Sequence, residues 1–261
     1  MHVFPERYFG SSEGMEDVNG AMYFDSLTSY KKKFLVPFIK GLPEKARVLD
    51  AGCGKGKTVR LIMELRPDVT VVGTDITDVS IFLPKGIHFV QCSIDDIASH
   101  FEMESFDAII CQHVIEHLVY PTAMMYAFHA LLKRKGRLFL ETPNWTRLLV
   151  PFSPLYFWDD YTHIHPYSIT SIRRLHNEYD FDTEYATSVS SVDMGNRIKK
   201  TRKSKLGVKK DIQEKEVISS KKPFVKKIFD LALDLSIHYF LRDIIVAVAT
   251  KREAKHEEKS L

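Results

Sequence analysis

The chain has 261 residues, 44% of them hydrophobic and 27% charged, with a net charge of +3, which suits a soluble protein with one full core and additional segments. No apolar run approaches the roughly 20 residues of a membrane span, and residues 1–15 lack the basic and then apolar order of a signal peptide. Three cysteines without a C-x-x-C spacing predict reduced thiols and a cytoplasmic protein.

Residues 1–45 contain aromatic, amphipathic helical material, notably at 22–24 and 34–39. We expect this segment to form a helical cap over the ligand pocket of the domain that follows. Simple packing of these side chains against a sheet is the alternative.

A nucleotide site is predicted where the first strand ends. Val48 and Leu49 suit a buried strand, and the strand leads through Asp50 into a loop that contains Gly52, Cys53, Gly54 and Gly56. Glycines allow a sharp turn and a close approach of a ligand to the backbone. Residues 58–63 can then begin a helix whose N–H groups face the ligand.

Three interpretations compete for this loop. In the dinucleotide fingerprint G-x-G-x-x-G the third glycine would come one place later than it does here. Residues 51–58 also fit a relaxed phosphate-binding loop, but the later strands at 108–111 and 137–140 do not end in the magnesium-binding Asp that such an enzyme needs. Residues 48–56 closely resemble the first motif of class I methyltransferases that depend on S-adenosylmethionine (SAM), and the rest of the chain agrees with this third interpretation.

The next two strands would complete the cofactor site. Residues 69–75 are predicted to form a strand that ends in Asp75. Asp75 follows the glycines by the number of residues at which an acid binds the ribose hydroxyls in nucleotide folds, and Ile76 beside it is a further candidate for cofactor binding. After a strand at 87–92, the resemblance implies that Ser93, Ile94 and Asp95 surround the adenine. Asp95 could also be a helix N-cap.

The fourth strand, ending near residue 112, leads into a segment with several titratable groups. The resemblance places Gln112 and His113 beside the methionine part of SAM. On a helix, His113, Glu116 and His117 would share one face and could reach one metal ion. The cluster is similar to the acidic-and-His cluster that ubiquinone-pathway O-methyltransferases carry at this place, and the resemblance implies a divalent metal. An inverted zinc-protease motif does not suit a segment that starts directly from a parallel strand. The preferred interpretation is that Glu116 and His117 fix the loop over SAM without a metal.

A long polar and aromatic segment follows the fifth strand at 131–144. Its pattern of Pro-Asn at 143–144 and Thr-His-x-x-x-Tyr-Ser at 162–168 resembles one branch of the family, found among sugar and small-molecule methyltransferases. Ser168 is predicted to cap a helix at 169–179. His163 is the first candidate for the base or substrate orienter, with a structural role at the 143–144 turn as the alternative. The other candidates for the chemistry are His113, Asp160 and His165.

The charge is unevenly distributed. Residues 195–261 contain 18 Lys/Arg and 9 Asp/Glu, a net of +9, whereas the first 194 carry 19 against 25, a net of −6. Within 191–242, a basic loop at 197–222 precedes an amphipathic helix at 223–242. This insertion could be a substrate lid or dimer helix, could contact an anionic membrane through 199–242, or, with the weakest support, could touch nucleic acid.

We therefore expect an α/β, Rossmann-like, doubly wound sheet of seven strands, six parallel and the last antiparallel. The expected regions are a helical cap at 1–45, a SAM-binding core at 46–190, the insertion at 191–242, and the last strand with a charged tail at 243–261. The resemblance implies SAM as cofactor, S-adenosylhomocysteine as product, and O-methylation of a small molecule, first of all a sugar or a lipid-linked glycan unit. A quinone-type or phenolic acceptor, a phosphate-loop NTPase and a SAM-binding protein without catalysis are the alternatives. The protein could also lie peripherally at the inner membrane surface, and the oligomeric state is not predicted.

Overall fold

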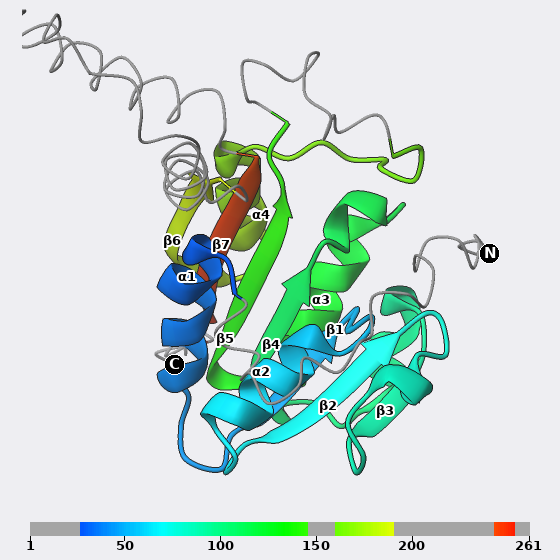
Figure 1. Ribbon diagram of the computed structural model, residues 1–261. Helices are drawn as coiled ribbons and strands as arrows, with labels where there is room; N and C mark the ends of the chain where they lie inside the picture. The colour runs from blue at the N-terminus through cyan, green and yellow to red at the C-terminus, as the bar shows by residue number, and fades with distance from the viewer. Residues whose placement is uncertain (1–26, 146–159, 191–242, 254–261) are drawn as a thin grey trace, which may run out of the picture.

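The computed structural model describes residues 27–145, 160–190 and 243–253, and Figure 1 shows a central twisted sheet with helices on both faces. In chain order the helices and strands are α1 (Ser29–Lys40), β1 (Arg47–Ala51), α2 (Lys57–Leu65), β2 (Thr70–Asp75), β3 (His88–Gln91), β4 (Phe106–Gln112), α3 (Pro121–Leu131), β5 (Leu132–Pro143), α4 (Ile169–Glu178), β6 (Phe181–Val189) and β7 (Ile244–Lys251). Three short 3-10 helices, η4 (Ser80–Phe82), η5 (Ile94–His100) and η6 (Ile115–His117), lie between them.

The predicted seven-stranded sheet is confirmed. The strand order is β3-β2-β1-β4-β5-β7-β6, and β1 pairs in parallel with both β2 and β4. Strand β7 lies between β5 and β6 and is antiparallel to both, so the other six strands share one direction. The last strand of the chain is therefore inserted between two earlier ones.

The two faces of the sheet carry separate hydrophobic clusters. Four consecutive residues of β1, 48–51, are buried, as expected for a strand covered on both sides. Leu35 of α1 and Ile62 of α2 belong to the cluster on one face, and Phe128 of α3 and Ile172 of α4 belong to the cluster on the other. This burial makes the central strands a rigid support for the loops at their carboxyl ends.

Two predicted helix starts had different outcomes. Ser168 caps α4 as expected: its hydroxyl accepts from the Ser171 N–H at 3.1 Å, and the two serines form a capping box. The prediction of an N-cap at Asp95 is wrong. Ser93 caps η5 instead, because its hydroxyl is the acceptor for the Asp95 N–H at 3.3 Å.

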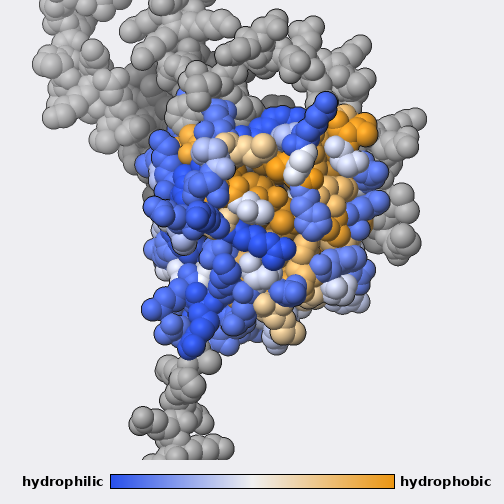
Figure 2. Space-filling model, turned by 90° about the horizontal axis from the view of Figure 1, so that it is seen from below, coloured by the Kyte–Doolittle hydropathy of each residue, from blue (hydrophilic) through white to orange (hydrophobic). Residues whose placement is uncertain are grey.

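Figure 2 views the molecule from below, onto the side where the parallel strands begin. Apolar side chains gather in one area of this otherwise largely hydrophilic face. A cavity at the start of β2 is lined mainly by apolar side chains, among them Met63, Val69 and Ile87. It lies at the end of the sheet opposite to the predicted cofactor site.

Several predictions fall outside the described residues. These are the aromatic residues at 22–24, and the basic loop and amphipathic helix within 191–242, so the alternatives for those segments stay predictions. Helix α1 packs on the sheet through the cluster that contains Leu35 and Ile39. In the described part of the chain, no helix combines the length and the apolar character that crossing a bilayer requires.

Candidate functional site

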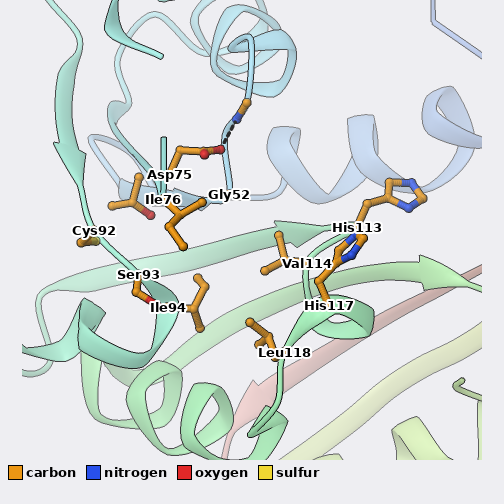
Figure 3. Close-up of a pocket in the computed structure, with 12 residues that line it drawn as sticks. Gly52, Asp75, Ile76, Cys92, Ser93, Ile94, His113, Val114, His117 and Leu118 are labelled. Atoms are coloured by element: carbon orange, nitrogen blue, oxygen red, sulfur yellow. Dashed lines mark hydrogen bonds between the residues drawn. The ribbon is translucent and has the colours of Figure 1, made fainter. Parts of the chain in front are cut away.

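A pocket lies at the carboxyl ends of β1, β2 and β4, where the strand order reverses direction and ligands of such sheets usually bind. It holds about 800 Å³ of empty space, part of which is open to solvent. Figure 3 shows Cys92, Ser93 and Ile94 at one end and His113 and His117 at the other. Seven residues predicted to bind the cofactor line it, namely Gly52, Gly54, Asp75, Ile76, Ser93, Ile94 and His113.

The glycine loop is held against the end of β2 by backbone hydrogen bonds. The N–H groups of Gly52 and Cys53 both donate to the Thr74 carbonyl at 2.8 Å. Gly52 has a φ of 79°, and a Cβ added to it would lie 2.3 Å from Val114 Cγ2. Gly54 has a φ of 48°, but nothing lies within 4 Å of an added Cβ. The loop is therefore closed at Gly52 by Val114, which follows β4, and is open toward the pocket at Gly54.

Asp75 is fixed at the end of β2 as the predicted ribose ligand. Its Oδ2 accepts from the Gly54 N–H at 3.0 Å, drawn as a dashed line in Figure 3, and its Oδ1 accepts from the Thr77 N–H at 3.0 Å. Burial raises the pKa of Asp75, and these two backbone donors partly offset that rise. The carboxylate thus joins the glycine loop to the ribose side of the pocket.

The other five predicted cofactor residues do not line the pocket. Asp95 is exposed, and Cys53 and Gly56 are buried. Asp50 is buried at 2% exposure beneath the loop, and its Oδ2 has no hydrogen-bond partner among the described residues. Burial raises the pKa of Asp50 to about 7, with Lys31 lowering it and Asp75 raising it further. A buried, unpaired carboxyl oxygen beside the loop suits a cationic ligand group.

Gln112 is part of a buried hydrogen-bond network centred on Glu141. Its Nε2 donates to Glu141 Oε2 at 2.8 Å, and its Oε1 accepts from the Thr58 hydroxyl at 2.7 Å. Tyr30 of α1 donates to Glu141 Oε1 at 2.9 Å. Glu141 is fully buried at the end of β5 and belongs to no motif of the sequence analysis. Its apolar neighbours in sequence were the only available sign that it points into the protein.

His113 is positioned between two buried carboxylates. Its Nε2 lies 2.9 Å from Glu141 Oε1, and its Nδ1 lies 3.5 Å from Glu116 Oε1. Burial by itself would lower the pKa of His113, but its interactions with Glu116 and Glu141 raise it to about 10. At neutral pH this ring is therefore an imidazolium, and it is unsuited to remove a proton from a substrate.

The segment at 113–117 does not form the helix that would place three ligands on one face. His113 has a φ of 54° and lies outside η6, which contains only residues 115–117. Instead, Glu116, His117 and His163 are brought together, and one ligand atom from each lies within 4.8 Å of the others. A metal ion held here would use His163 in place of His113. Metal binding at this place stays a prediction.

The segment at 160–168 brings its candidate residues to the same end of the pocket. The rings of His117 and His163 have centroids 4.8 Å apart, and His163 Nε2 lies 3.7 Å from Asp160 Oδ2. Of the described histidines, only His113 and His117 line the pocket. His163 does not line the pocket, and the side chains of His117 and His163 are 7% and 13% exposed. His165 Nε2 lies 3.4 Å from the Val119 carbonyl. The sequence analysis did not consider His117 as a proton acceptor.

Relatives of the chain agree with this geometry. A family model described as a methyltransferase domain matches residues 25–186. Two proteins named ubiquinone biosynthesis O-methyltransferase are similar: one from Xanthomonas axonopodis pv. citri is 38% identical over 111 residues, covering 40% of this chain and 46% of that protein, and one from Xanthomonas campestris pv. campestris is 35% identical over 107 residues, covering 39% and 44%. The matched stretch thus spans about half the length of these curated relatives.

Solved structures share the fold at low sequence identity. A SAM-dependent methyltransferase from Archaeoglobus fulgidus superimposes with a TM-score of 0.61 at 18% identity, covering 85% of this chain and 91% of that one. Phosphoethanolamine N-methyltransferase 2 from Haemonchus contortus, in complex with SAM, superimposes with a TM-score of 0.57 at 14% identity, covering 86% of this chain and 53% of that one. A phosphate-loop enzyme is therefore not supported, and Lys57, which that interpretation required, is exposed and does not line the pocket. The glycine loop, the acid at the end of β2, the strand order and the family match together show that the chain belongs to the class I SAM-dependent methyltransferases.

Proposed function

We propose that this protein transfers the methyl group of SAM to a hydroxyl group of a small molecule. The observation that supports this most directly is the shape of one pocket, with Gly54 and Asp75 at the nucleoside side and two histidines at the opposite end. Methyl transfer is an in-line attack on a sulfonium methyl, so the protein must align the acceptor, exclude water and remove one proton. The histidine end of the pocket offers the groups for the last task.

The acceptor class that we favour is phenolic, of the quinone-precursor type. The curated relatives are named for an O-methylation in ubiquinone biosynthesis. A phenol, with a pKa of about 10 as in tyrosine, gives its proton to a neutral imidazole far more readily than a sugar alcohol does. The motif at 162–168 is the observation that favours the sugar acceptor predicted from the sequence, so both classes belong in the test.

The negative surroundings of the pocket suit the methyl donor. Buried carboxylates at Asp50, Glu116 and Glu141 lie near the loop and the histidine end, and His113 and Lys31 supply the facing cations. SAM carries a sulfonium and an ammonium group, whereas S-adenosylhomocysteine has lost the sulfonium charge. The ionised carboxylates therefore stabilise the donor more than the product, and Asp50, with a pKa of about 7, is only partly ionised at neutral pH.

The first experiment is calorimetric titration of the full chain with S-adenosylhomocysteine and, separately, with ATP and magnesium. We expect micromolar binding of the first and none of the second. Asp75→Ala should abolish that binding, whereas the control Asp78→Ala, which removes an exposed acid bonded to Ser80 outside the pocket, should leave it intact. Binding of ATP alone would overturn the assignment of the loop.

The second experiment uses SAM with a labelled methyl group and two acceptor sets, simple catechols and methyl glycosides, each with and without a metal chelator. Labelled catechol product in the presence of chelator is expected. Transfer only to glycosides would replace the phenolic acceptor by a sugar. Cofactor binding without transfer to any acceptor would favour a SAM-binding protein that does not catalyse methylation.

A further inference from the structure

The segment at 76–83, which follows β2, folds back onto the glycine loop. Its first residue, Ile76, lines the pocket (Figure 3). At its other end Leu83 packs against Gly56, since a Cβ added to that glycine would lie 2.5 Å from Leu83 Cδ2. The segment that begins at the ribose side of the pocket is therefore in contact with the glycine loop.

Arg60 of α2 joins this segment to the glycine loop by hydrogen bonds. Its Nη1 donates to the carbonyls of Lys55 and Gly56, at 2.8 and 3.3 Å, and its Nη2 donates to the Phe82 carbonyl at 2.5 Å. The planar guanidinium can make these bonds together because its N–H groups point in fixed directions. Helical side chains lean toward the start of their helix, which brings Arg60 back to the glycine loop. One side chain thus holds two segments together.

The segment at 76–83 buries little of its own surface. Val79 is buried, but η4 contains no buried residue, and Ile81 is 82% exposed. Lys55 Nζ lies 5.4 Å from the centre of the Phe82 ring, which is a cation–π contact between the same two segments. Because a segment with few buried side chains detaches easily, we expect its position to depend on the hydrogen bonds of Arg60.

The place of Arg60 in the sequence does not serve the stability of its own helix. Helix α2 begins at Lys57, so Arg60 lies near the helix N-terminus, where the partial positive charge of the helix disfavours a cation. The first turn contains no acidic residue that would offset this effect. Arg60 does not line the pocket either, so it can act on a ligand only through the two segments that it joins.

We propose that Arg60 is a positioning residue for the nucleoside part of SAM, because it holds the segment at 76–83 on the glycine loop and so keeps Asp75 in place against Gly54. This inference rests on SAM as the ligand of the pocket, as in the proposed function. When the segment detaches, the Asp75 carboxylate and the Gly54 N–H lose the arrangement in which they are bonded at 3.0 Å. Only the attached form binds the cofactor well, so the apparent affinity falls with the fraction of attached molecules.

The first test is calorimetric titration of full-chain variants with S-adenosylhomocysteine, together with their thermal unfolding. Arg60→Ala should weaken binding by about 10-fold, because it removes hydrogen bonds from a charged donor. Arg60→Lys should fall between this variant and the wild type, since it keeps the charge but not the planar group. The matched control is Arg66→Ala. Arg66 ends the same helix and donates to the carbonyls of Leu42 and Pro43, each at 2.7 Å, and it does not line the pocket. Its loss should lower Tm and leave the affinity unchanged.

The second test is hydrogen exchange of the same proteins, which reports on the segment directly. The N–H group of Phe82 donates to the Val79 carbonyl at 2.9 Å, so its exchange rate rises when the segment detaches and this turn unfolds. We expect faster exchange across 76–83 in Arg60→Ala than in the wild type or in Arg66→Ala. Saturation with S-adenosylhomocysteine should slow it again. Equal exchange in Arg60→Ala and the wild type would refute the proposal.

Two calorimetric results would also overturn the proposal. These are an unchanged affinity in Arg60→Ala, and an equal loss of affinity in Arg66→Ala, which would show that general destabilisation is the cause. If Arg60→Ala does not fold, Arg60→Lys and Arg66→Lys give the same comparison. With an acceptor in hand, Arg60→Ala should raise the KM for SAM by a larger factor than it lowers kcat, and the opposite split would contradict a role in cofactor positioning. Wild-type protein that binds no S-adenosylhomocysteine would instead contradict the proposed function itself.

Discussion

Replacing Gly54 by alanine should separate cofactor binding from stability. Its φ of 48° makes any side chain there adopt the left-handed region, which costs about 1 kcal/mol, and no atom within 4 Å would meet the new methyl group. For a chain of this size that cost lowers Tm by about 2–4 °C. The methyl group would, however, project from the pocket wall next to the N–H that contacts Asp75, so we expect affinity for S-adenosylhomocysteine to fall by at least about 10-fold.

Gly52→Ala should destabilise the protein more than Gly54→Ala, because a steric clash adds to the same backbone cost. The added Cβ would lie 2.3 Å from Val114 Cγ2, and overpacking of a well-packed site costs about 1–3 kcal/mol. The total of about 2–4 kcal/mol predicts a loss in Tm at least twice that of Gly54→Ala. Because Val114 also lines the pocket, cofactor affinity should fall as well.

Thermal unfolding measures the change in Tm, and calorimetric titration measures the affinity for S-adenosylhomocysteine. Gly86→Ala is the control for both. Gly86 has a φ of 85° and no atom within 4 Å of an added Cβ, but it lies at the opposite end of the sheet. It should show the backbone cost alone. Unchanged cofactor affinity in Gly54→Ala would refute the placement of the cofactor, and equal stability of the Gly52 and Gly54 variants would refute the steric argument.

Three further outcomes are expected. Asp75→Asn should weaken S-adenosylhomocysteine binding by about 10-fold or more, since hydrogen bonds to a charged group contribute about 1.5–3 kcal/mol each, whereas Lys57→Ala should leave it unchanged; calorimetry of both variants checks this. Tyr30→Phe should reduce the free energy of unfolding by about 2 kcal/mol in urea titrations, because Glu141 loses a buried donor. Burial lowers the pKa of His176 to about 4, below the ordinary value of 6.5, so the unfolded chain binds a proton first as the pH falls. Between pH 7 and pH 5 the free energy of unfolding should therefore fall by about 2 kcal/mol less in His176→Gln than in the wild type. An equal fall in both proteins would contradict the low pKa of His176.

Local features of the sequence predicted the glycine loop and the acid at the end of β2, both of which line the pocket. The buried run before Asp50, the alternating glycines and the acid at the end of the next strand each depend on a few neighbouring residues. Their physical causes are local too: glycine alone tolerates the left-handed turns, and a strand buried on both faces must be apolar. The seven-stranded sheet with its last strand antiparallel was implied by the family resemblance, and the structure confirms it. The place of β7 between β5 and β6 was shown only by the structure.

Only the tertiary structure decided the arrangement of the histidines at the other end of the pocket. A periodic argument placed His113 on one helix with Glu116 and His117, but the chain turns through a positive φ at His113 and directs that ring to Glu141, 28 positions away. Its position between the carboxylates of Glu116 and Glu141 raises its pKa, which no local pattern shows.

The partners of His117 illustrate the same limit. Thr162 and its carbonyl lie 45 positions further along the chain and reach the ring because the N–H groups of Ile164 and His165 donate to the Glu116 carbonyl in η6. The sequence by itself determined which residue types were available and predicted a nucleoside site at the glycine loop. The packing of segments distant in the chain determined which histidines line the pocket and which carboxylates and hydroxyl groups contact their rings, because these properties follow from distances between side chains that no sequence spacing specifies.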